Sequence, residues 1–145
     1  PEMDEERQIL RSSARTNIAK QKKSTITAAS IVRAQKSIND IYVDEKVEDY
    51  VLSLVFATRD PQKYGLKDMV QLIHYGASPR ASINLILASK ARAFLEGRGY
   101  ITPEDVRYIG KDILRHRIIL TYEAEAEELT SEDIIQRLFD SIEIP

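Results

Sequence analysis

The 145-residue chain contains no cysteine. It can therefore form neither a disulfide nor a thiolate zinc site, and it offers no thiol nucleophile. No hydrophobic run approaches the roughly 20 residues that a helix needs to span a bilayer, and no signal-peptide pattern opens the chain. We expect a soluble, cytoplasmic domain without a membrane partner.

A strong excess of one charge is also missing, because the formal net charge is only -2. A dedicated DNA-binding domain normally shows a basic excess, so nucleic acid is not the favoured partner. One local basic bias exists near the N-terminus, without interleaved aromatic residues, at Arg7, Arg11, Arg15, Lys20, Lys22 and Lys23. An all-α interaction module that binds nucleic acid or protein through this basic N-terminal face is the alternative hypothesis.

The motifs of an autonomous enzyme are absent too. There is no glycine-rich loop followed by Lys and Ser or Thr to cradle a phosphate, and no serine lies in a nucleophile elbow. His74 and His116 belong to no metal-spaced motif. We expect a solvated loop for the acidic residues Glu123, Glu125, Glu127 and Glu128. The sequence therefore predicts no catalytic residue and no metal site.

What the sequence does contain is helical periodicity. Apolar residues recur at helical spacing within 4–15, 28–41, 47–55, 79–96, 103–114 and 131–142. Thr102 with Asp105, and Thr130 with Asp133, are typical of helix N-termini. Residues 118–122 could be extended, but no second convincing strand exists, so we expect no sheet. The predicted fold is an all-α bundle of about five to six helices around a central buried helix, 79–96.

The segment before that central helix carries a cation in an unusual place. Ser78 suits the N-cap and Pro79 the first helical position, so Arg80 falls at the second. A cation there is disfavoured by roughly 0.3 to 1 kcal/mol because the helix dipole is positive at this end. A charge-assisted bond to a phosphate contributes roughly 1.5 to 3 kcal/mol and exceeds that cost. Either Arg80 binds an anionic ligand, or its stem packs on the surface and a nearby carboxylate pairs with it.

Several linked motifs point to one family. They are Gly76-Ala77-Ser78-Pro79-Arg80-Ala81, the stretch from Leu95-Glu96-Gly97-Arg98 to Thr102-Pro103-Glu104-Asp105-Val106, Leu114-Arg115-His116-Arg117, and Tyr122-Glu123-Ala124-Glu125-Ala126. Their order and spacing resemble the C-terminal helical lid of MoxR-type AAA+ ATPases. Residues 43–50 resemble the helix that precedes this region in the family, so the resemblance runs from about 41 to 129.

The resemblance implies a role for each part of the chain. Arg80 would be the sensor 2 residue that reaches the ATP phosphates, supported by Ser78, Pro79 and Ala81 in the same turn. Residues 1–24 would leave an ATPase core that this chain lacks, and 25–145 would form the lid. Mg²⁺ and most ATP contacts would belong to the core. The family also implies a hexameric ring of neighbouring subunits with chaperone-like action, beside von Willebrand factor A-domain partners. The fragment alone would not hydrolyse ATP.

Overall fold

The computed structural model describes residues 3–13 and 26–145, within which seven α-helices, two short 3-10 helices and one two-stranded sheet occur. The chain divides into two units, Pro1–Val32 and Arg33–Pro145. The first unit contains α1 (Met3–Ser13), whose Arg7 Nη1 lies 2.7 Å from Asp4 Oδ1. None of the described helices combines the length and the apolar character needed to cross a bilayer.

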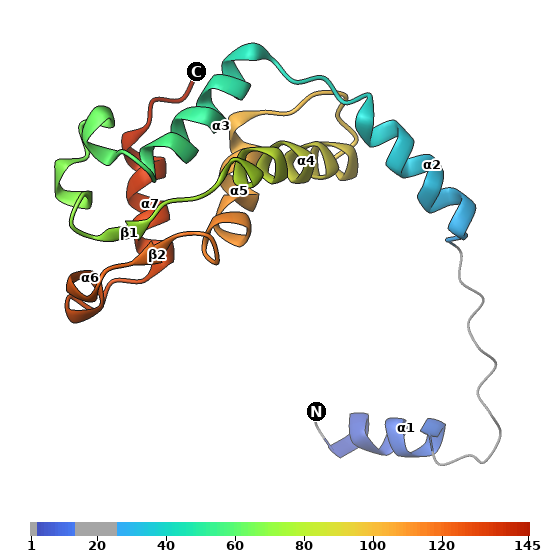
Figure 1. Cartoon of the computed structure of the whole chain (residues 1–145). Helices are drawn as coiled ribbons and strands as arrows, with labels where there is room; N and C mark the ends of the chain where they lie inside the picture. The colour runs from blue at the N-terminus through green and yellow to red at the C-terminus, as the bar shows by residue number, and fades with distance from the viewer. Residues whose placement is uncertain (1–2, 14–25) are drawn as a thin grey trace. The chain divides into compact units, whose positions relative to one another are not determined.

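Four helices build the second unit: α3 (Glu45–Ala57), α4 (Pro79–Leu95), α5 (Pro103–Leu114) and α7 (Ser131–Ser141). Helix α4 lies between α3 and α5, and α7 packs against both α5 and α3 (Figure 1). The connections carry the 3-10 helices η1 (Pro61–Tyr64) and η2 (Lys67–Met69), and the short helix α6 (Tyr122–Ala126). Helix α2 (Ala28–Asn39) has no buried residue. The predicted all-α bundle is confirmed.

Local sequence chemistry sets where these helices begin. Asp44 caps α3 by accepting a hydrogen bond from the Lys46 N–H at 2.9 Å. Thr130 and Asp133 form a complete capping box at the start of α7. Each such cap satisfies backbone N–H groups that the first helical turn leaves without partners. The helix starts predicted at Thr102 with Asp105 and at Thr130 with Asp133 are confirmed, since both pairs form capping boxes.

The core is built from apolar side chains of all four helices. Fully buried members are Leu54 of α3, Leu85 of α4, Val106 and Leu114 of α5, and Ile134, Ile135 and Leu138 of α7. Gly110 lets α7 approach α5 closely, because a Cβ at this position would collide with the Phe139 ring. The loop between α3 and α4 also contributes to the core, through the buried side chains of Met69 and Leu72.

The expectation that no sheet forms is wrong. Strand β1 (Ile73–Tyr75) pairs antiparallel with β2 (Ile119–Leu120), with Ile73 opposite Leu120. The segment 60–75 between α3 and α4 therefore contains η1, η2 and β1. Strands of two and three residues are too short for an alternating pattern, and their pairing joins segments far apart in sequence. A prediction from short stretches of sequence can therefore detect neither these strands nor their pairing.

Helix α4 takes the predicted central position, but its apolar side chains are not covered on all sides. Its buried residues follow one stripe at a spacing of four: Ala81, Leu85, Ser89 and Ala93. Ile83 is 58% exposed and Leu87 is 51% exposed. Three of these four residues are alanine or serine, whose small size allows close packing against α3 and α5. The expectation of a buried central helix is therefore wrong for Ile83 and Leu87, and also for Leu95 at its C-terminal end.

Candidate functional site

The segment that enters α4 presents Arg80 as the sequence predicted. Ser78 has extended backbone angles (φ -76°, ψ 168°) at the N-cap, and Pro79 begins the helix. Arg80 follows at the second helical position, and its side chain is exposed. The Ser78 side chain makes no capping hydrogen bond, so only its backbone serves the helix start. Ala81, the fourth residue of the predicted site, is fully buried and anchors this turn to the core.

The turn is pressed against the end of α3. A Cβ at position 76 would lie 2.8 Å from the Arg59 backbone nitrogen and closer still to the Thr58 carbonyl oxygen. Real Cβ atoms essentially never come that close to backbone atoms. Gly76 is therefore required by contact, and its lack of a side chain brings the two segments together.

Side chains at the end of α3 bind both backbone polar groups of Ala77, the residue that follows Gly76. The Ala77 N–H donates to Thr58 Oγ1 at 2.9 Å, and Arg59 Nε donates to the Ala77 carbonyl at 2.5 Å. Thr58 Oγ1 in turn donates to the Val55 carbonyl at 2.6 Å. Ala77 and Thr58 are both buried. The position of the Arg80 turn is thus fixed by α3, and sequence reasoning missed Thr58 and Arg59.

Arg80 differs from most arginines of this unit in its partners. Within residues 33–145, carboxylates pair with Arg92, Arg98, Arg107, Arg115 and Arg137. No carboxylate of the described residues lies within ion-pair distance of Arg80, and no described hydrogen bond involves its guanidinium. The alternative in which a nearby carboxylate pairs with Arg80 has no support in the described part of the chain. An exposed, unpaired guanidinium at a helix N-terminus is suited to bind an anion.

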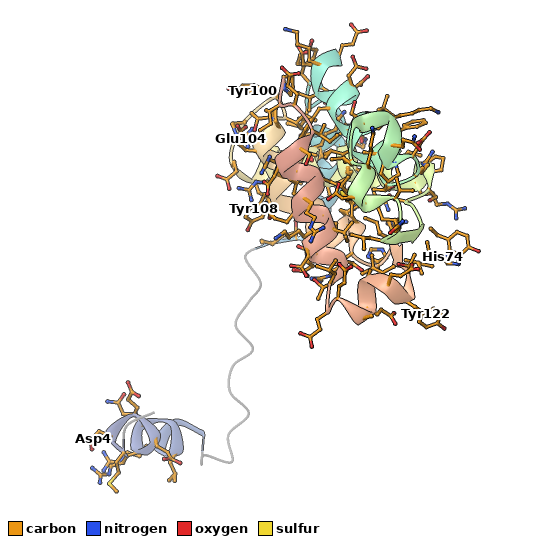
Figure 2. The ribbon with its side chains drawn as sticks, turned by 90° about the vertical axis from the view of Figure 1, so that its left-hand side faces the viewer. Asp4, His74, Tyr100, Glu104, Tyr108 and Tyr122 are labelled. Carbon is orange, nitrogen blue, oxygen red and sulfur yellow. The ribbon has the colours of Figure 1, made fainter. Side chains whose placement is uncertain are left out.

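Other candidate groups are not brought together into a site. Glu123 and Glu125 lie on α6, so the expected acidic loop is partly a five-residue helix, with its carboxylates exposed. Figure 2 shows His74 and Tyr122 at this end of the unit. Within the described residues, no three His, Asp or Glu side chains cluster closely enough to hold a metal ion.

Comparisons with known proteins show which family this chain belongs to. The AAA lid domain family matches residues 69–138. Chaperone MoxR1 of Mycobacterium tuberculosis is 37% identical over all 145 residues, which cover 38% of its length. Protein MoxR of Methylorubrum extorquens is 32% identical over 111 residues, 72% of this chain and 32% of that protein. The chain belongs to the MoxR family of AAA+ proteins.

A solved structure supports the same assignment. The crystal structure of a predicted ATPase from Cytophaga hutchinsonii matches with a TM-score of 0.86 and 38% identity, over 99% of this chain and 44% of that one. The chain thus spans about two fifths of the length of MoxR1 and of the Cytophaga protein. The lid resemblance drawn from the sequence motifs is confirmed.

A second motif of this MoxR lid has a structural explanation that the sequence did not reveal. Asp105 is buried and accepts hydrogen bonds from Arg98 at 2.6 and 2.8 Å, from Arg92 Nε at 3.1 Å, and from the Thr102 N–H at 2.9 Å. Burial by itself would raise the pKa of Asp105, but the hydrogen bonds from Arg98 and Thr102 outweigh it and hold the pKa below its usual value. The network ties α4 to α5.

Arg92 extends this network to the surface of α5. Its guanidinium carbon lies 3.3 Å from the centre of the Tyr108 ring, a cation–π contact. Figure 2 places Tyr108 and Glu104 along the same side of the lid. Since these contacts leave Arg92 and Arg98 fully engaged within the protein, we assign both a structural role, unlike Arg80.

The basic N-terminal face is described only in part. Arg7 and Arg11 are exposed on α1, whereas Arg15, Lys20, Lys22 and Lys23 lie outside the described residues. The match of the whole chain to MoxR relatives does not favour the alternative module that binds nucleic acid or protein through this face.

Proposed function

We propose that this chain acts as the lid of a MoxR-type ATPase, with residues 1–24 leading out of an ATP-binding core and 25–145 closing over the nucleotide. Arg80, supported by the turn of Ser78, Pro79 and Ala81, neutralises phosphate charge of the bound ATP. The observation that carries the proposal is an exposed Arg80 without a carboxylate partner among the described residues, on a turn fixed by α3. Mg²⁺ and the attacking water belong to the core.

In this proposal, the lid couples the state of the nucleotide to the movement of subunits. Charge developing on the transferred phosphoryl group is stabilised by preorganised cations, so Arg80 responds to hydrolysis. The lid then moves as a rigid body within a cytoplasmic hexameric ring that remodels client proteins, with von Willebrand factor A-domain proteins as partners. The 145-residue chain by itself does not hydrolyse ATP.

The test is Arg80→Ala in the protein that carries this chain behind its ATP-binding core. We expect ATP affinity, turnover or both to fall by about tenfold or more, the equivalent of one charge-assisted hydrogen bond. Isothermal titration calorimetry and phosphate release measure the two quantities. Arg137→Ala is the matched control, because Arg137 is also exposed but its Nη1 lies 3.9 Å from Asp68. Unchanged affinity together with unchanged turnover in Arg80→Ala would sink the sensor role.

A gel-shift assay with DNA distinguishes the proposed lid from the alternative module that binds nucleic acid. The proposed lid should not shift DNA at physiological salt, whereas a salt-dependent shift by the chain alone would favour the basic N-terminal face. Light scattering of the protein that carries the ATP-binding core, with and without ATP, measures its molar mass and so tests whether it assembles into a hexameric ring.

A further inference from the structure

Arg59 directly follows the C-cap of α3, and its guanidinium lies against the turn that carries Arg80. Two contacts fix its plane. Its Nε donates to the Ala77 carbonyl at 2.5 Å, and its Cζ lies 4.9 Å from the centre of the Phe56 ring. Ala77 directly precedes the N-cap of α4, so this guanidinium is held beside the start of that helix.

No carboxylate of the described residues pairs with Arg59. Asp60, its neighbour in sequence, pairs with Lys63 instead, at 2.8 Å. Because Arg59 uses Nε for Ala77, its two terminal nitrogens remain available as donors. Two guanidinium groups without a carboxylate partner among the described residues therefore serve the start of α4: Arg80 within its first turn, and Arg59 bound to the Ala77 carbonyl just before it. The helix dipole adds further positive potential there. An anion that contacts both guanidinium groups would offset the repulsion between their like charges.

We propose that Arg59 is a second phosphate-binding residue, which contacts the same nucleotide triphosphate as Arg80. A triphosphate carries enough anionic oxygens for two guanidinium forks, whereas a single carboxylate could serve only one of them bidentately. The proposal rests on the proposed function, in which Arg80 meets ATP. It adds α3 to the elements that bind the nucleotide, through a residue outside the Ser-Pro-Arg turn.

The experiment compares Arg59→Ala with Arg117→Ala in the protein that carries the ATP-binding core. Arg117 is a matched control because its Nε also donates to a backbone carbonyl, that of Ile113 at 3.0 Å, and no carboxylate of the described residues pairs with it. Calorimetric titration with ATP should show binding weakened about tenfold or more by Arg59→Ala. Arg117→Ala should remain within about twofold of the wild type. Equal affinities of both variants would overturn the proposal.

A double-mutant cycle distinguishes phosphate binding from mere support of Arg80. If Arg59 only positions Arg80, the double variant Arg59→Ala/Arg80→Ala binds ATP as weakly as Arg80→Ala alone, and the proposal fails. If Arg59 contacts phosphate itself, the double variant is weaker than either single variant. Should Arg80→Ala alone leave ATP binding and turnover unchanged, the proposed function fails, and the single Arg59 variants still decide whether Arg59 binds phosphate.

A conservative variant covers the case in which Arg59→Ala does not fold. Arg59→Lys keeps the positive charge but loses the planar fork, so ATP affinity should fall severalfold while the thermal unfolding midpoint stays near that of the wild type. Wild-type affinity in Arg59→Lys would count against a bidentate phosphate contact.

Discussion

Gly76 shows how a single residue positions the proposed site. Its backbone lies against the Thr58 carbonyl, and the next residue hydrogen-bonds to Thr58 and Arg59. The sequence identified the Gly-Ala-Ser-Pro-Arg turn through cap chemistry, which is local. It could not identify the partners 18 and 19 residues earlier, because no rule of local spacing connects a helix C-terminus to a later turn.

Gly76→Ala should therefore destabilise the protein by about 2 to 3 kcal/mol, the upper range for overpacking, because the new Cβ meets rigid backbone rather than a movable side chain. Chemical denaturation of the 145-residue chain measures the change. Gly99→Ala is the control, since a Cβ there meets nothing within 4 Å, and its free energy of unfolding should stay within about 0.5 kcal/mol of the wild type. Similar effects at both positions would contradict the contact.

At the scale of elements, helix α4 combines a fully buried stripe with an exposed apolar one. The sequence predicted the helix, its start and its central position. It could not tell which apolar residues face the core, because an apolar composition on nearly every side leaves the direction open. Ile83 and Leu87 line a groove of about 320 Å³ with Leu52 of α3. Here the three-dimensional packing, rather than periodicity, decides burial.

Leu85→Ala and Ile83→Ala test which stripe of α4 is buried, because the two truncations should lower the free energy of unfolding by different amounts. Leu85 is fully buried, so its truncation should cost about 2 to 5 kcal/mol through lost burial and a cavity. Ile83 is more than half exposed, so its truncation should cost less than about 1 kcal/mol, because alanine also favours the helix. Urea unfolding of both variants provides the comparison. A larger loss at Ile83 would mean that α4 is rotated from the orientation described.

At the scale of the whole lid, the buried Asp105 joins α4, α5 and the loop between them through two arginines. Its position in a Thr-Pro-Glu-Asp start was predicted as a helix cap. The second role, as a partner of Arg92 and Arg98, depends on how α4 packs on α5 and was not predictable from spacing. One carboxylate thus contributes to a cap and to interhelical packing.

This carboxylate should make the stability of the lid sensitive to acid. Because the folded state holds the pKa of Asp105 below its unfolded value, its contribution is complete above about pH 4 and is lost as the pH falls through the lowered pKa. Asp105→Asn should cost about 3 kcal/mol at pH 7, since it leaves the half-buried guanidinium groups of Arg92 and Arg98 without their buried carboxylate, and less at pH 3. Denaturation at both pH values tests this. Asp133→Asn, at an exposed capping box, should cost much less, because asparagine can still accept the hydrogen bond from the Thr130 N–H.

The contact between the end of α3 and the Arg80 turn also bears on where this domain begins. The stretch that matches the AAA lid family starts at residue 69, after Thr58 and Arg59. A chain trimmed to 69–138 would keep Arg80 but lose the groups that bind Ala77, and it would uncover the part of α4 that packs against α3. The smallest unit able to present Arg80 in its native orientation therefore includes α3, and expression boundaries should be drawn upstream of residue 44.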